Sequence, residues 1–145
     1  MTEKIFVDSN VLIYSRDLAA PKKQVRALEW MEYLWNSRQG RLSFQVLNEF
    51  YITVTKKLKP GLKKEPAREE IRDFLAWNPI VIDESILIRA WAVEDRYALS
   101  SWDSLIVAAA EIQRCRYLLT EDLRDGQELF DIKVINPFLR SPESL

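Results

Sequence analysis

The sequence predicts an α/β domain whose mostly parallel sheet is covered on both faces by helices. Short apolar runs alternate with longer segments of helical periodicity, and these runs are continuous, which is typical of parallel strands buried on both faces. The length of 145 residues corresponds to one domain. We therefore expect a single domain over residues 1–140 and a loose C-terminal tail at residues 141–145.

The predicted strands are short and rich in Ile, Val and Leu. Ile5-Phe6-Val7 forms the first run and ends at Asp8, and Pro79 precedes a later one. The strands are expected at residues 5–7, 42–44, 80–82, 117–119 and 133–135.

The predicted helices follow from apolar residues spaced three and four apart, and from residues that begin or end helices. Pro21 begins the longest helix, and Gly40 is expected to cap its end. Pro60-Gly61 ends the next one, whereas Asp83 and Ser100 precede the last two. The helices are expected at residues 9–17, 21–38, 45–58, 66–77, 84–98 and 102–114.

The composition excludes several classes of chemistry. The chain has no His, which removes Ser-His-Asp triads, imidazole acid–base catalysis and His-bound zinc. Its single Cys excludes a disulfide framework, and its three Gly residues are too far apart for a P-loop or a G-x-G-x-x-G motif. Carboxylates, hydroxyls, Lys and Arg remain as reactive groups, and carboxylates suit hard cations such as Mg²⁺ or Mn²⁺.

The chain shows no sign of membrane insertion or export. No run approaches 18 apolar residues, and the N-terminus lacks the layout of a signal peptide. We therefore expect a cytoplasmic protein.

Four acidic residues follow predicted strands at positions that should share one edge of the sheet. Asp8 directly follows the first strand, and Asp122 comes shortly after the strand at residues 117–119. Glu49 and Asp103 lie in the first turns of helices. Ligands of parallel α/β sheets bind at this edge, and a divalent cation would relieve the repulsion among converging carboxylates.

Each of these acids also has a purely structural interpretation. Asp8 could cap the following helix, and Ser100-x-x-Asp103 matches a capping box. Glu49 could be solvated and Asp122 could belong to a turn. Asp83 also follows a predicted strand and is interpreted as a cap, so position alone does not identify a metal site.

Five segments together resemble the PIN domain family, most closely the VapC-type toxins of prokaryotic toxin–antitoxin pairs. They are IFVDSNVLIY, SFQVLNEFY, SSWDSLIVAAA, LLTEDLRDGQ and the closing NPF, and they cover essentially the whole chain in the family's order. The resemblance implies a three-layer α/β/α sandwich with a mostly parallel, short-stranded central sheet. It also implies a Mg²⁺- or Mn²⁺-dependent endoribonuclease, in which an ion-bound water attacks the phosphodiester.

The resemblance also assigns roles to individual residues. The catalytic acids would be Asp8, Glu49, Asp103 and Asp122, and Asp125 would join them in holding metal. The supporting polar residues would be Ser9, Asn10 and Thr120. The family further implies a cognate antitoxin protein and a homodimer as partners.

RNA must be bound by a chain whose net charge is only −1. The one marked basic segment, residues 56–72, supplies the candidate phosphate contacts Lys56, Lys57, Lys59, Lys63 and Lys64. An equal alternative is that these side chains only form a solvated rim. Trp102 adjoins Asp103 and could line the cleft. Two other functions stay open: a non-catalytic RNA- or protein-binding PIN module, and a phosphatase with Asp8 as nucleophile. The phosphatase would need an acid at the position of Asn10.

Overall fold

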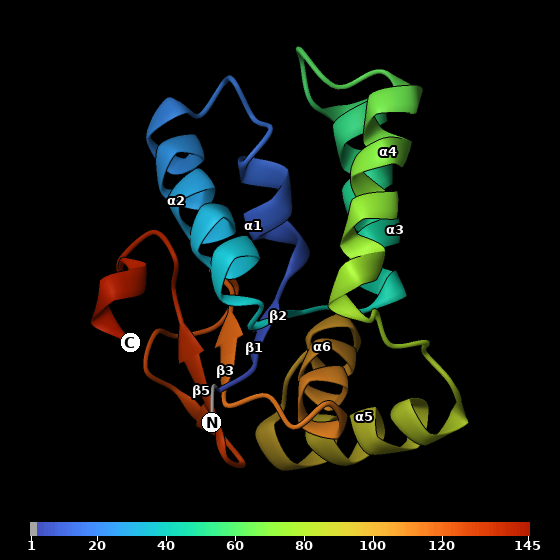
Figure 1. Cartoon of the computed structure of the whole chain (residues 1–145). Helices are drawn as coiled ribbons and strands as arrows, with labels where there is room; N and C mark the ends of the chain where they lie inside the picture. Colours follow the sequence, from blue (N-terminus) through green and yellow to red (C-terminus); the bar gives the residue numbers. More distant parts are fainter. Residues whose placement is uncertain (1–2) are drawn as a thin grey trace.

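The computed structural model describes residues 3–145, which form a five-stranded sheet of order β2-β1-β3-β5-β4 (Figure 1). Neighbouring strands are parallel, except that β4 runs antiparallel to β5. The strands are β1 (Ile5–Val7), β2 (Gly40–Arg41), β3 (Tyr117–Leu119), β4 (Glu128–Leu129) and β5 (Ile132–Ile135). The mostly parallel α/β architecture predicted from the sequence is confirmed.

Six α-helices connect the strands in this part of the chain. They are α1 (Ser9–Tyr14), α2 (Pro21–Ser37), α3 (Phe44–Ile52), α4 (Lys64–Phe74), α5 (Glu84–Tyr97) and α6 (Ser101–Ile112). α1 packs against α2 and α3, α3 packs against α4, and α5 packs against α6. The loop that joins α3 to α4 lies at the end of this pair farthest from the sheet (Figure 1).

The register of the central strands brings two polar residues together at the carboxyl edge of the sheet. β1 is fully buried and lies between β2 and β3, with Val7 opposite Leu119. The next residues of the two strands, Asp8 and Thr120, are therefore neighbours. The Asp8 N–H donates to the Leu119 carbonyl at 3.0 Å, which extends the ladder by one step.

Two predicted helix starts are confirmed by their caps. The Asp83 carboxylate accepts a hydrogen bond from the Ile86 N–H at 3.1 Å, and α5 begins at the next residue. The Ser100 hydroxyl accepts from the Asp103 N–H at 3.1 Å and caps α6.

Gly40 does not cap α2, contrary to prediction. The helix ends at Ser37 and is capped by Arg38, which adopts a left-handed conformation with φ 60°. Gly40 instead lies in β2 beneath the indole ring of Trp77, and a Cβ at this position would come within 2.8 Å of the ring atoms. The absence of a side chain at residue 40 therefore serves close packing rather than helix termination.

The strands predicted at residues 42–44 and 80–82 are wrong. Ser43 and Ile80 form one isolated parallel bridge, and Val81 is 62% exposed. The Ser43 hydroxyl accepts from the Val46 N–H at 3.3 Å and caps α3, so the chain turns into a helix where a strand was expected. The second strand lies two residues earlier, at Gly40–Arg41.

Two predicted helices continue into irregular turns. α3 is followed by a π-helix at Thr53–Lys57, in which the Leu58 N–H donates to the Thr53 carbonyl at 3.0 Å. α4 is followed by a 3-10 turn at Leu75–Trp77. β4 was not predicted, because a strand of two residues gives no periodic signal.

The chain after Arg140 forms a 3-10 turn at Pro142–Ser144, in which Pro142 is buried. The Trp30 indole N–H donates to the Arg140 carbonyl at 2.9 Å just before this turn. No helix within residues 3–145 combines the length and the apolar character needed to cross a membrane.

Candidate active site

Asp8 is the buried centre of a polar cluster at the carboxyl edge of the sheet. Only 2% of the residue is exposed. Its carboxylate accepts hydrogen bonds from the Ser9 N–H at 2.7 Å and from the Thr120 hydroxyl at 2.8 Å. The Ser9 hydroxyl donates more weakly, at 3.4 Å. Asp8 caps α1, as the structural interpretation expects, and it also faces other acids.

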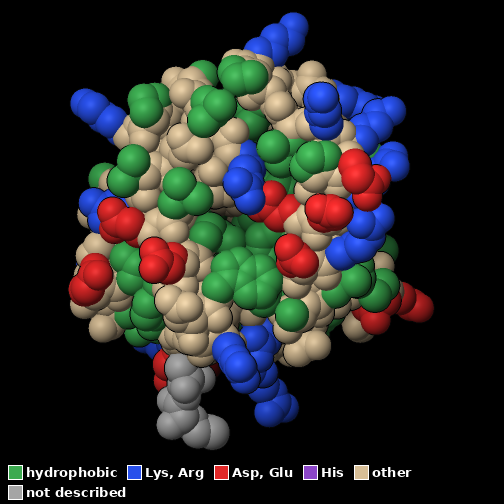
Figure 2. All heavy atoms as spheres, turned by 45° about the horizontal axis from the view of Figure 1, so that its top comes forward, with side chains coloured by type: hydrophobic (Ala, Val, Ile, Leu, Met, Phe, Trp, Pro, Cys, Tyr) green, Lys and Arg blue, Asp and Glu red, His purple; other side chains and the backbone are tan. Residues whose placement is uncertain are grey.

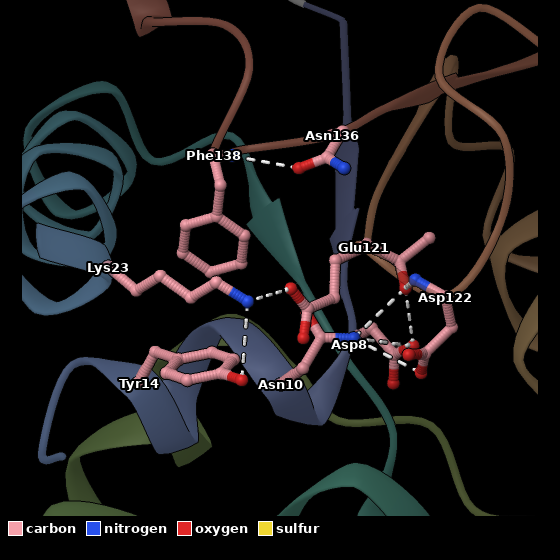
Figure 3. A network of polar contacts seen from close by, with 9 residues as sticks. Asp8, Asn10, Tyr14, Lys23, Glu121, Asp122, Asn136 and Phe138 are labelled. Carbon is pink, nitrogen blue, oxygen red and sulfur yellow. Dashed lines mark hydrogen bonds and ion pairs between the residues drawn. The ribbon is translucent and has the colours of Figure 1, made fainter. Parts of the chain in front are cut away.

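Asn10 links Asp8 to Asp122 (Figure 3). Its amide nitrogen lies 3.2 Å from an Asp122 oxygen, 3.5 Å from an Asp8 oxygen and 3.1 Å from the Thr120 hydroxyl. The same hydroxyl accepts from the Asp122 N–H at 3.1 Å and donates to Asp8. Thr120 thus uses its one donor and both acceptor positions within the cluster.

Two helices bring the other acids toward this cluster. Glu49 lies half-buried on α3, and its Oε2 atom is buried without a hydrogen-bond partner. Asp103 lies in the first turn of α6, where its N–H is capped by the Ser100 hydroxyl. Asp8 feels the charges of Glu49 and Asp122, and Asp103 feels that of Asp122.

The environment of these acids disfavours their charged forms. Burial raises the pKa of Asp8 to about 7, although the hydrogen bonds from Thr120 and Ser9 oppose this rise. The charges of Asp122 and Glu49 contribute to the same rise. Burial also raises the pKa of Asp103, with a further contribution from Asp122. A bound cation would relieve both burial and repulsion.

Six carboxylates of residues 3–145 form ion pairs with basic side chains, whereas those of the cluster do not. Glu121 adjoins Asp122 and pairs with Lys23 at 2.8 Å (Figure 3). Within residues 3–145 the ion pairs are Arg16–Glu70, Lys23–Glu121, Arg26–Glu29, Arg72–Glu65, Arg89–Glu111 and Arg140–Asp125. None of these pairs includes Asp8, Glu49, Asp103 or Asp122.

Asp125 is engaged outside this group. Both of its carboxylate oxygens contact the Arg140 guanidinium, at 2.9 and 3.1 Å, and one accepts from the Asn136 N–H at 2.9 Å. Burial by itself would raise the pKa of Asp125, but these hydrogen bonds lower it overall. A metal-binding role for Asp125 would first require the release of Arg140.

The polar atoms around the cluster fit a hard cation with its water shell. Within the cluster, Asn10 Oδ1 and Glu49 Oε2 are buried without hydrogen-bond partners. The Gln45 amide on α3 and the Ser104 hydroxyl on α6, the helices that carry Glu49 and Asp103, are also buried without partners. Buried polar atoms without a protein partner are rare unless a water molecule or an ion contacts them. In the described residues no three acidic, His or Cys side chains yet converge tightly on one point, so an ion would have to draw the carboxylates inward.

Sequence reasoning did not single out Gln45 or Ser104. Gln45 lies one helical turn before Glu49 on α3, and Ser104 directly follows Asp103 on α6. The four-residue spacing between Gln45 and Glu49 places them on one face of the helix, which was a usable signal.

A cleft of ≈ 350 Å³ extends from Glu49 between α3 and the start of α6. It is lined by Asn48, Glu49, Ile52, Thr53, Lys57 and Trp102, and we call it the Trp102 cleft. Figure 2 looks onto the carboxyl edge of the sheet and shows a hollow containing hydrophobic side chains, with acidic and basic groups around it. Lys57 is the candidate phosphate contact that lines this cleft; Lys56, Lys59, Lys63 and Lys64 are exposed but do not line it.

Comparison with known proteins identifies the family. The sequence model of the PIN domain matches residues 5–128. The chain belongs to the PIN domain family. The match includes all four acids of the cluster. No curated protein sequence matches the chain.

Two solved structures share the fold of this PIN domain. One is a chain of a toxin–antitoxin complex from Klebsiella pneumoniae, with 21% identity and a TM-score of 0.65, covering 92% of this chain and 98% of that chain. The other is a chain of VapBC2 from Rickettsia felis bound to a DNA fragment from their promoter. It has 15% identity and a TM-score of 0.59, with 90% of this chain and 96% of that chain covered.

Proposed function

We propose that this PIN domain is a Mg²⁺- or Mn²⁺-dependent endoribonuclease that hydrolyses RNA phosphodiester bonds. The observation that carries the proposal is the cluster of four acids around the buried Asp8, to which residues 3–145 supply no basic partner. Carboxylates concentrated without counter-charge match the ligand preference of hard divalent cations.

The residues of the cluster have separable roles in this reaction. Asp8, Asp103 and Asp122 would hold the ion, and Glu49 would share it or orient the attacking water. A divalent cation bound there lowers the pKa of water and offsets the charge of the scissile phosphate. Asn10, Thr120 and Ser9 fix the carboxylates through the hydrogen bonds described above. Attack by water leaves a 5′-phosphate and a 3′-hydroxyl.

The biological role we propose is that of a cytoplasmic toxin restrained by an antitoxin protein. The fold shared with chains of two toxin–antitoxin complexes supports this role. We also propose that the protein forms a homodimer. A small neighbouring gene whose product binds this chain would identify the antitoxin.

The nuclease activity is tested by incubating the purified chain with total RNA. We expect cleavage in Mg²⁺ or Mn²⁺, no cleavage in EDTA, and 5′-phosphate ends on the products. An Asp95→Asn variant, which changes an exposed acid on α5, should cleave like the parent. A chain that binds RNA but never cuts it would instead support a non-catalytic module, and phosphatase activity without RNA cleavage would support Asp8 as a nucleophile.

The basic segment gives a second expected result. Changing Lys56, Lys57 and Lys59 together to Gln should weaken RNA binding and make it less dependent on salt, because fewer counterions are released. The slope of log Kd against log salt should fall by about 2, since single strands lose about 0.7 for each of the three phosphate contacts removed. The matched control changes Lys4, Arg38 and Arg114, which precede strands at the opposite edge. A slope that is unchanged in the Lys56, Lys57 and Lys59 variant would mean that RNA binds elsewhere.

A further inference from the structure

We propose that the Trp102 cleft binds one unstacked base of a single-stranded RNA, next to the scissile phosphate, between Trp102 and Ile52. This inference rests on the proposed ribonuclease function and specifies how the substrate is held. The cleft begins at Glu49, within the acidic cluster, so a nucleotide whose phosphate lies among the acids can place its base in the cleft.

The two apolar walls of the cleft come from different helices. Trp102 from α6 is 46% exposed, and Ile52 at the end of α3 is 37% exposed. An exposed indole beside an aliphatic side chain is suited to stacking on the flat face of a base. Bases inside an A-form duplex are not available for such stacking, which favours a single strand.

The polar groups of the cleft suit the edge and the backbone of a nucleotide. The Asn48 and Thr53 side chains line it, and neither makes a side-chain hydrogen bond within the described residues. Lys57 lies at the other end from Glu49 along the helix and has no ion-pair partner in the described part of the chain. A phosphate at Lys57 and another at the acids would leave the base between them.

The π-helix at Thr53–Lys57 helps to form this binding surface. Its first and last residues, Thr53 and Lys57, both line the cleft. The volume of ≈ 350 Å³ lies at the lower end of small-ligand sites, about 300–1,000 Å³, and suits one nucleoside.

The test uses a short single-stranded RNA that contains a mapped cleavage site, with each nucleotide replaced in turn by an abasic one. Parent, Trp102→Ala and Trp102→Phe proteins are compared for kcat and KM in Mg²⁺, and for Kd with Ca²⁺ in place of Mg²⁺. The control is Trp91→Ala, which removes a 60% exposed indole from α5 outside the cleft.

We expect Trp102→Ala to raise KM and Kd about tenfold with little change in kcat, from the loss of one base stack. Trp102→Phe should restore most of the affinity, and Trp91→Ala should behave as the parent. Replacing one nucleotide beside the scissile bond by an abasic one should raise the Kd of the parent to a similar extent. The same replacement should not raise the Kd of the Trp102→Ala variant any further.

The outcomes separate the two proposals. If the parent cleaves RNA and all three variants bind RNA as tightly as the parent does, the base-binding cleft is overturned and the proposed nuclease activity is retained. If the losses of affinity from the abasic nucleotide and from Trp102→Ala add up, the base does not stack on Trp102 and the base-binding cleft is overturned as well. A cleft that holds a protein segment instead of a base predicts either of these two results. A parent that cuts no RNA but binds it through Trp102 would overturn the nuclease and support the cleft.

Discussion

Asp103→Asn is expected to abolish RNA cleavage while leaving the metal-free protein at least as stable as the parent. The variant keeps nearly the same shape but removes one negative charge from the ion site, so kcat should fall at least about 100-fold. Burial and the charge of Asp122 raise the pKa of Asp103 against an opposing hydrogen bond from Ser100, so its charged form is less favoured in the metal-free folded protein than in the unfolded chain. Removal of the charge should therefore not destabilise the fold.

The capping interpretation of Asp103 predicts the opposite pair of results. It expects normal cleavage and a loss of roughly 0.5–1 kcal/mol in the free energy of unfolding. The structure shows the serine half of this capping box, in which the Ser100 hydroxyl accepts from the Asp103 N–H. The hydrogen bonds of residues 3–145 do not include the reciprocal bond from the Ser100 N–H to the Asp103 carboxylate. Thermal melts in EDTA and an RNA cleavage assay measure both quantities, with Asp95→Asn as control. Cleavage at the parent rate would remove Asp103 from the site.

The metal-free parent is expected to lose stability as pH rises from about 4 to about 7. Burial raises the pKa of Asp8 from 3.8 to about 7, so the folded chain holds this proton more tightly than the unfolded chain. The resulting stabilisation is fully present below the unfolded pKa and is lost as pH rises through the folded pKa. The free energy of unfolding should fall by at most about 1.4 kcal/mol per pH unit, and this decline should stop above pH 7.

Asp8→Asn isolates this effect because its side chain cannot lose a proton. Urea unfolding in EDTA between about pH 4.5 and 8.5 gives the free energy of unfolding for both proteins. Asp83, whose pKa is lowered by the Ser85 hydroxyl and the Ile86 N–H, acts in the opposite direction but is present in both and cancels. Saturating Mg²⁺ should reduce the decline in the parent, because the cation competes with the proton. A parent–variant difference that stays constant with pH would contradict the assignment.

The main part of the cluster followed from the sequence because parallel strands end at a common edge. Asp8 could be placed from the apolar run before it, and the register of β1 and β3 then makes Thr120 its neighbour. Asp122 lies in the loop after β3, and Asn10 holds it beside Asp8. The ion pair between Asp125 and Arg140 could not be predicted, because a contact between a loop and the C-terminal segment leaves no periodic signal.

The regions that differed from prediction are those where tertiary packing overrides local pattern. Leu42-Ser43-Phe44 is apolar enough for a strand, but the Ser43 hydroxyl caps α3 and ends β2 early. Gly40 has the spacing of a helix cap, yet Trp77 from a distant turn determines its role. The π-helix arises within a segment of ordinary helical periodicity, so only the structure reveals it.

The topology of the sheet also bears on when the protein becomes active during synthesis. The four acids lie directly after β1, on α3, on α6 and in the loop after β3, and β3 pairs with β5, which follows it in the sequence. The Thr120 N–H donates to the Ile135 carbonyl, so the hydroxyl that organises Asp8 and Asp122 is fixed only after β5 has been made. A nascent chain that has not yet been extended through β5 therefore holds an unfinished site, and the proposed nuclease could not cut RNA at that stage of its synthesis.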